Sequence, residues 1–400
     1  MRPGQTGGPA VSGLPPGFLA EGFRDGHPWE AYARLRRERP FATWDGEPGF
    51  TAVSRYSDVH AISSDPATFC SARGILLVDL AAGHAAPPTI MHTDPPAHTR
   101  YRALVAPAFR PAITRGLEPA VRRRVAGLLD AMPSGEPVDV VDALAAPLPM
   151  QVICELLGLP GYEWRRYLAW SEAFVPGASA LPEEEQAAAR DDAVRELLAA
   201  ARRRRERPGD DVISLLAGLE VDGDRLTDVE LLMFLIQLLV AGNETTRHSV
   251  AGGLLALAEH PAQWRLLRDG ASPLRAVEEI LRWTTPVVHF LRTATRDTSV
   301  GTRKIAEGER LMLLYGSANR DEAHFGPTAA TFDVTRADRP HLAFGHGPHF
   351  CLGAALARLE IRVLLEELLT RHRHLTPAGP PEWNGSNVVT GLRRAPLTLT

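Results

Sequence analysis

The chain has 400 residues, of which 44% are hydrophobic and 23% are charged, and its formal net charge is -4. This composition is that of a folded globular protein, and the lack of a basic surplus argues against a general nucleic-acid binder. The three cysteines, Cys70, Cys154 and Cys351, are too few and too scattered for a disulfide framework, so a reducing cytoplasm is the expected location.

The beginning of the chain predicts a tail followed by one domain. Residues 1–18 are rich in glycine and proline and lack the apolar centre of a secretory signal peptide, so we expect a flexible tail there. No long linker or fixed-period repeat follows, so residues 19–400 are expected to form a single domain. Residues 41–55 hold two short alternating runs around a DGEPG turn, which predicts a β-hairpin. Residues 74–96 form an unusually apolar loop, as is typical of a segment that lines a cavity.

From residue 98 to residue 270 the hydrophobic pattern is almost entirely helical, and one long helix is specified best. Thr227 and Glu230 have the spacing of a capping box, in which each side chain accepts a hydrogen bond from a free amide at the helix start. The pattern then continues to Glu259, which gives a helix about 50 Å long. Because this helix is apolar on nearly every side, we expect it to be buried.

The long helix is not expected to cross a membrane. Its longest apolar run, residues 231–242, is interrupted by Gln237 and falls short of the ~20 residues that a span needs. Beyond residue 285, β-branched runs predict short strands, a last helix begins near Cys351, and residues 386–400 predict a closing pair of strands. The expected fold class is therefore mainly α with a small β portion (α+β).

Cys351 stands between a loop rich in glycine and histidine and the start of the last helix, and four kinds of site must be weighed there. A phosphate loop is disfavoured because the glycines lack the required spacing. A zinc site could use His341, His346, His349 and Cys351, although the usual paired ligand spacings are missing. A buried structural thiol is the commonest role for a cysteine. The fourth possibility is a thiolate, which the positive end of the helix dipole favours and which suits haem iron.

Residues 344–353, FGHGPHFCLG, resemble the haem-binding signature of the cytochrome P-450 family, the haem-thiolate monooxygenases. Every fixed position of the family pattern Phe-Gly-x-Gly-x-His-x-Cys-x-Gly is met. The resemblance extends from residue 92 to the C-terminus, and it implies the cytochrome P-450 fold with a long central helix over haem b. It implies Cys351 as the proximal ligand of the iron. The haem-contacting residues that it implies are His98, Arg102, Ala241, Arg292, Phe344, Gly345, His349 and Gly353.

The middle of the long helix reads AGNETT, residues 241–246, which is unusual for a buried helix. Taken alone, Thr245 is expected to donate a hydrogen bond to the carbonyl of Ala241 four residues earlier. Glu244 would cost several kcal/mol in an apolar core unless it is paired or solvated, which indicates a polar cavity. The segment is similar to the family's oxygen-activating motif. The resemblance implies that Glu244 and Thr245 are the acid and the alcohol that deliver protons to the co-substrate dioxygen.

Glu279 and Arg282 lie three residues apart on a predicted helix, where a surface ion pair is the ordinary interpretation. They resemble the family's Glu-x-x-Arg pair, and Arg336 occupies the place of its third member. The resemblance implies that these three residues hold the loop that presents the cysteine.

The substrate pocket is expected to be built from residues 74–91 and 174–182, the inner face of the long helix, and residues 287–291 and 387–390. The residues predicted to line it are Leu235, Leu238, Val287, Val288, His289, Asn387 and Val388. A largely aliphatic lining suits a lipophilic small molecule. These sequence segments resemble those of bacterial family members that hydroxylate sterols, terpenoids and lipids, and also those of polyketide-tailoring members. The resemblance implies regio- and stereoselective hydroxylation or epoxidation. Radical coupling or ring formation on a natural product, or haem binding without oxygen insertion, are the alternatives.

No flavin or nicotinamide fingerprint is found, so no bound flavin is expected and electrons must come from another protein. For a soluble bacterial member of the family, the resemblance implies a ferredoxin and a ferredoxin reductase. We expect an acidic ferredoxin to dock on the cysteine face. The arginines predicted to form that docking face are Arg100, Arg110, Arg115, Arg358 and Arg362.

Overall fold

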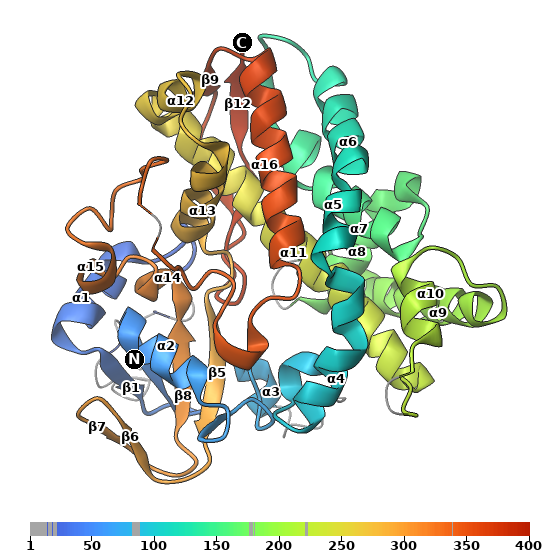
Figure 1. The fold of residues 1–400 in the computed structure, drawn as a ribbon. Coiled ribbons are helices and arrows are strands. Elements are labelled where there is room, and N and C mark those ends of the chain that lie inside the picture. Colours follow the sequence, from blue (N-terminus) through green and yellow to red (C-terminus); the bar gives the residue numbers. More distant parts are fainter. Residues whose placement is uncertain are drawn as a thin grey trace, which may run out of the picture.

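The computed structural model describes residues 14, 18, 22–81, 89–175, 179, 181–220, 223–337 and 339–400. Figure 1 shows most helices gathered in the upper and right-hand part of the molecule and a twisted sheet at the lower left. The longer helices are α1 (Trp29–Glu38), α2 (Tyr56–Ser64), α4 (Ala97–Val105), α6 (Glu118–Asp130), α7 (Pro147–Leu157), α8 (Trp164–Phe174), α9 (Glu183–Glu206), α10 (Val212–Gly218), α11 (Asp228–Glu259), α12 (Pro261–Arg268), α13 (Pro273–Thr284) and α16 (Ala354–Arg371). The shorter ones are α3 (Leu77–Ala81), α5 (Pro111–Gly116), α14 (Tyr315–Ala318) and α15 (Glu322–Phe325), with tighter or wider turns at Ile90–His92, Ala106–Phe109, Val141–Ala145, Gly161–Glu163 and Gly347–His349.

The main sheet has the order β1-β2-β8-β5-β3, with β1 (Phe41–Trp44), β2 (Phe50–Val53), β8 (Arg310–Leu314), β5 (His289–Ala294) and β3 (Phe69–Cys70). Strands β1 and β2 pair antiparallel, which confirms the predicted hairpin. The smaller sheets are β4 (Pro137–Asp139) with β12 (Pro396–Leu399) and β9 (Leu375–Pro377), β10 (Glu382–Trp383) with β11 (Leu392–Arg394), and β6 (Thr298–Val300) with β7 (Arg303–Ile305). The predicted closing pair is wrong in its partners, because β11 pairs with β10 whereas β12 lies between β4 and β9.

Helix α11 is the axis of the fold. Its N-cap Thr227 and Glu230 form the predicted capping box, and the helix runs for 32 residues, which corresponds to about 48 Å. It packs against α7, α8, α9, α13 and α16, and its apolar side chains belong to the largest core cluster. Among the described residues it is the one helix long and apolar enough to cross a membrane. About half of its most apolar 18-residue window, 50%, is buried inside the fold.

Two residues from the segment that was expected to be a tail belong to the core. Leu14 and Phe18 are buried in a cluster with Phe23 and Tyr32. The remainder of residues 1–17 lies outside the described residues.

The turn from α13 into β5 is fixed by buried hydrogen bonds. Thr285, in the left-handed region at φ 37°, accepts a hydrogen bond at its carbonyl from the ring of His27, and Asn319 donates to its hydroxyl. Burial lowers the pKa of His27 to about 4, so this ring is neutral at pH 7. Asn319 also accepts a hydrogen bond from the amide of Leu342, at 2.7 Å. The same residue therefore ties the end of α13 to the segment that leads to Cys351.

Candidate active site

The loop before Cys351 is held close to its neighbours by glycine. Gly345 and Gly347 have φ angles of 66° and 72°, a backbone region that other residues rarely adopt. A side chain at Gly347 would also collide with the carbonyl of Ser63 at the end of α2. The amide of Cys351 donates a hydrogen bond of 2.9 Å to the carbonyl of Phe344, which closes the loop. Helix α16 begins three residues later, at Ala354.

Several positively polarised groups around the sulfur of Cys351 stabilise its thiolate form. The amides of Gly353 and Ala354 and the guanidinium groups of Arg102 and Arg358 favour the thiolate. Burial of the sulfur disfavours the thiolate more than these groups favour it. The pKa of the thiol is therefore raised in the protein without a bound cation. A cation bound at the sulfur would reverse this balance, because a coordinating thiol loses its proton outright.

The zinc interpretation of this loop is wrong. Within the part of the chain that the structure describes, no three His, Cys, Asp or Glu side chains converge as metal ligands. Each histidine has a different neighbour: His341 contacts Glu278, His346 stacks on His60, and His349 bonds to the hydroxyl of Ser71.

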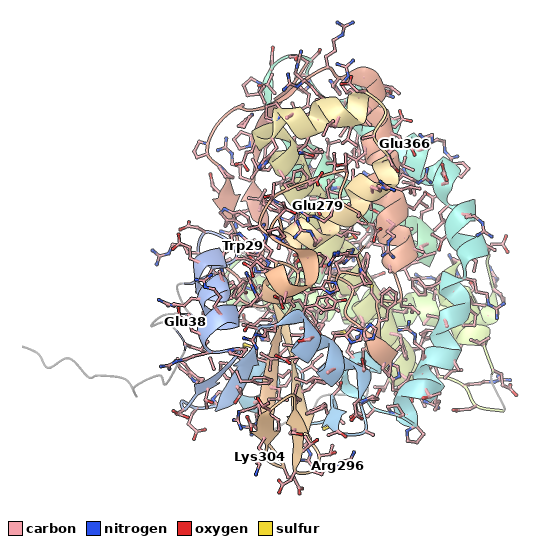
Figure 2. All side chains as sticks on the ribbon, turned by 60° about the vertical axis from the view of Figure 1, so that its left-hand side comes forward. Trp29, Glu38, Glu279, Arg296, Lys304 and Glu366 are labelled. Carbon is pink, nitrogen blue, oxygen red and sulfur yellow. The ribbon has the colours of Figure 1, made fainter. Side chains whose placement is uncertain are left out.

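Glu279 and Arg282 are both buried, so the interpretation as a surface ion pair is also wrong. The two side chains form a two-pronged pair, with both N–O distances at 2.7 Å. Arg336 donates to the same carboxylate at 3.0 Å, and the amide of Asp333 donates to its other oxygen at 2.8 Å. Figure 2 places Glu279 near the centre of the view, whereas Lys304 and Arg296 lie at its lower edge. The structure thus brings the three predicted residues together.

Four predicted haem-contacting side chains lie close together near the cysteine loop. The rings of His98 and His349 are 4.3 Å apart. Arg102 donates to the carbonyl of Phe350 and Arg292 to that of Leu291, and neither arginine forms a salt bridge with a described residue. Burial, followed by the charges of Arg292, His98 and Arg102, lowers the pKa of His349 to about 2.

This basic cluster, His98, Arg102, Arg292 and His349, fits a group that carries carboxylates. Burial and the charge of Arg102 also lower the pKa of His98, whose Nε2 atom is buried without a hydrogen-bond partner. Positive side chains gathered in this way attract an anion, and fork-shaped guanidinium groups are suited to carboxylates. The two propionates of a haem with its iron at Cys351 would meet both requirements.

One face of α11 opens in the middle of the buried helix. Ala241 is exposed, and Leu238, Gly242 and Thr245 are partly exposed, although the residues on both sides along the helix are largely buried. The four positions follow the spacing of a single helical face. The Thr245 hydroxyl donates to the carbonyl of Ala241 at 2.9 Å, as expected from local chemistry. This face therefore carries one alcohol on an otherwise apolar, accessible surface in the middle of α11.

Glu244 does not contact Thr245. Its side chain is 2% exposed, and its carboxylate lies 3.3 Å from Nε2 of His248 and 3.5 Å from Nη1 of Arg247. Arg247 in turn bonds to Glu172 of α8 at 2.6 Å. Sequence reasoning missed Arg247 and His248 as the partners of Glu244. The rule that a buried carboxylate must be paired pointed to them, since Arg247 and His248 lie three and four residues after Glu244.

The predicted pocket residues fall into two groups. Leu238, Val287, Asn387 and Val388 are partly exposed, as a pocket lining requires. The prediction differs from the structure at the other three, because Leu235, Val288 and His289 are buried among protein side chains. His289 bonds to the backbone of Asn387, and burial lowers its pKa to about 4. Residues 82–88, 176–178 and 180 of the two expected pocket segments lie outside the described residues.

Comparison with known proteins agrees with this geometry. A family model described as Cytochrome P-450 matches residues 274–397. The chain is 41% identical to the putative cytochrome P-450 126 of Mycobacterium tuberculosis, covering 95% of this chain and 96% of that protein. The chain belongs to the cytochrome P-450 family. This confirms the predicted family and the α+β fold, and this cytochrome P-450 is a monooxygenase that uses haem and dioxygen.

Two further relatives of this cytochrome P-450 bear on its substrate. The chain is 38% identical to a methyl-branched lipid omega-hydroxylase of Mycobacterium tuberculosis, covering 95% of this chain and 92% of that one. Its structure matches that of the Mycobacterium marinum cytochrome P-450 CYP268A2 in complex with pseudoionone, with a TM-score of 0.87 at 33% identity. That match covers 100% of this chain and 99% of the other.

Replacing Glu279 by Ala should lower the free energy of unfolding by about 3–5 kcal/mol, because two buried guanidinium groups would lose their carboxylate. The measurement is denaturant unfolding together with the haem content of the purified protein. Glu278→Ala, at the residue of α13 that precedes Glu279, is the matched control. Glu278 and its partner Arg358 are both more than one-third exposed, although its other partner His341 is largely buried, so a loss of about 1–2 kcal/mol, clearly smaller than for Glu279, is expected. Equal losses in the two variants would contradict the role given to Glu279.

Proposed function

We propose that this cytochrome P-450 inserts one oxygen atom from dioxygen into a lipophilic small molecule of the terpenoid, sterol, branched-lipid or polyketide type, by regio- and stereoselective hydroxylation. The observation that carries the proposal is the open face of α11, where Leu238 and Ala241 lie beside Thr245. An apolar surface with one alcohol suits a lipophilic substrate held beside a proton donor. A lipid hydroxylase and a structure in complex with pseudoionone among the relatives support it.

Different residues are proposed to bind the cofactor and to contact the substrate. Cys351 would hold the iron of haem b, and the basic cluster would hold its carboxylates. When bound, the haem supplies the activation of dioxygen. Leu238 and Ala241 exclude water and orient the substrate. Glu244 would relay protons towards Thr245, which passes a proton from Oγ1 to the substrate side. A proton relay of this kind favours oxygen insertion over radical coupling, which does not need one.

Replacing Thr245 by Ala should uncouple electron use from product formation. Without the hydroxyl, reductant is still consumed, but product per electron pair falls by about 10-fold or more and hydrogen peroxide appears instead. Candidate substrates are first chosen by the change in haem absorption on binding, from a panel that includes pseudoionone and methyl-branched fatty acids. Product, reductant and peroxide are then measured for the wild type, Thr245→Ala and the control Thr245→Ser, which keeps the hydroxyl.

Two outcomes would contradict the proposal. An unchanged product yield in Thr245→Ala would remove Thr245 from proton delivery. Binding of polar molecules alone, with no response to any lipophilic compound, would exclude the substrate class.

Electrons are proposed to come from a separate ferredoxin and its reductase, with no flavin bound to this chain. Three of the five arginines predicted to attract the ferredoxin have their charge compensated in the structure. Arg100 pairs with Asp224 and Glu230, Arg358 with Glu278, and Arg362 with Glu118 and Glu366. Arg110 and Arg115 are exposed and form no salt bridge with a described residue. Both flank or belong to α5, which packs against α16. The docking proposal therefore rests on Arg110 and Arg115.

The chain is proposed to work in a bacterial cytoplasm. Its three cysteines are free, as expected in a reducing compartment. Its relatives in Mycobacterium support a bacterial setting.

Replacing Arg110 and Arg115 together by Glu should slow ferredoxin-driven turnover by about 10-fold at low salt, because attraction to an acidic partner becomes repulsion. Turnover is measured over a range of salt concentrations. Reduction by dithionite and substrate binding should be unchanged. Arg202→Glu with Arg203→Glu, two exposed arginines of α9, is the matched control and should leave turnover as in the wild type. Unchanged ferredoxin kinetics in the Arg110 and Arg115 variant would exclude this docking site.

A further inference from the structure

Gln237 is the one polar residue in the longest apolar run of α11, residues 231–242. A glutamine there interrupts the pattern of a core helix, yet it is partly exposed in the structure. Ala241 follows it by four positions, so the two side chains are neighbours on the surface of the helix. Gln237 therefore belongs to the accessible surface of α11 that also carries Ala241 and Thr245.

The side-chain amide of Gln237 has no partner within the described part of the chain. Its Oε1 atom is buried and accepts no hydrogen bond there. Asn243, Arg247 and His248 of the same helix also have one buried atom without a partner, but each of them is bonded or paired through another atom of its side chain. A buried amide oxygen without a hydrogen bond is costly and calls for an explanation. A bound molecule that bonds to the amide supplies one.

An uncharged hydroxyl group suits this amide best. Oε1 accepts a hydrogen bond and the NH2 group donates one, so a hydroxyl can bond to either end of the amide. A carboxylate cannot donate to Oε1, and residues 228–246 of α11 contain no lysine or arginine to compensate its charge. The partly exposed residues Met233 and Leu238 on either side of Gln237 are apolar, so the rest of the bound molecule is lipophilic.

The length of α11 between Gln237 and Thr245 relates this hydroxyl to the place of oxidation. The two residues are eight positions apart, which corresponds to about 12 Å along the helix axis. Thr245 is the residue proposed to pass a proton to the substrate side. The carbon that is oxidised beside Thr245 therefore lies roughly two helical turns from the group that bonds to Gln237.

We propose that Gln237 is a specificity-determining residue: it binds the hydroxyl group of a lipophilic alcohol and directs oxygen insertion to a carbon about 12 Å away. The inference rests on the proposed function and narrows its substrate to an alcohol. One oxygen atom of dioxygen enters a C–H bond of this alcohol, and the other is released as water with two electrons from the ferredoxin and two protons. The first hydroxyl is unchanged, so the product is a diol.

The variant Gln237→Leu tests the proposal with two ligands that differ by one hydroxyl group, the branched alcohol hexahydrofarnesol and its parent hydrocarbon farnesane. The Kd of each is measured in the haem-loaded protein from the change in haem absorption. We expect the ratio of the Kd for the alcohol to the Kd for the hydrocarbon to rise by about 10-fold in Gln237→Leu, because the hydroxyl loses its partner. Comparing ratios cancels the different costs of removing the two ligands from water. Gln151→Leu makes the same exchange at a partly exposed position of α7 and should keep the wild-type ratio.

A purely structural role for Gln237 would change a different quantity. Because its amide has no hydrogen bond to a described residue, Gln237→Leu should not lower the free energy of unfolding of the protein without substrate. A loss of stability together with an unchanged ratio would show that the glutamine serves the fold, and it would overturn the proposal.

A second measurement uses the wild type alone, so it decides the question if Gln237→Leu fails to fold. Saturated branched alcohols of increasing chain length are converted, and mass spectrometry determines the position of the new hydroxyl. If Gln237 anchors the first hydroxyl, the number of carbons between the two oxygens should stay constant as the chain grows. A new hydroxyl at a constant distance from the free methyl end would overturn the proposal. If no lipophilic compound is bound or oxidised, the proposed function itself fails.

Discussion

The site depends on a loop that is held from outside. The amide of Cys351 bonds to Phe344 and that of Phe350 to Gly347 within the loop, and contacts with other elements add to these bonds. The buried Glu279 carboxylate gathers Arg282, Arg336 and the amide of Asp333, so the segment that precedes the loop is attached to α13. A pair of this kind tolerates no loss of one partner, since the other would remain charged in the interior. The buried ion pairs of Glu279 therefore help to position the segment that carries the sulfur, although they do not contact the sulfur itself.

Charge compensation also explains the two faces of the site. On the cysteine side, Arg102 and Arg292 form no salt bridge within the described part of the chain and lie beside two histidines, which makes the region attractive to an anionic group. On the α11 side the imbalance has the opposite sign, with two carboxylates around one guanidinium. The first region fits the carboxylates of a bound cofactor.

Local sequence signals predicted much of this arrangement. The capping box of Thr227 and Glu230 and the length of α11 follow from residues within the helix itself, and the spacing of Glu279 and Arg282 places both on one helical face. The cysteine loop was recognisable because its glycines and cysteine form one continuous segment. These features need no knowledge of what lies elsewhere in the chain.

Other features could not be read from the sequence because they depend on distant packing. The run around Leu235 and Leu238 is apolar except for Gln237, so the hydrophobic periodicity does not indicate which of the two leucines is accessible. The pair of Glu172 and Arg247 joins residues 75 positions apart, and no local pattern connects them. Strands β11 and β12 were predicted as neighbours because they follow each other, but their partners are chosen by where the chain returns.

The central claim is that the sulfur of Cys351 binds the iron of a haem. It is tested most directly by the absorption spectrum of the reduced carbon monoxide complex, recorded for the wild type and for Cys351→His. The wild type should purify with haem and show the thiolate-type absorption band, and the variant should lose that band even if it retains haem. A wild-type protein without haem, or an unchanged thiolate-type band in the variant, would contradict the account.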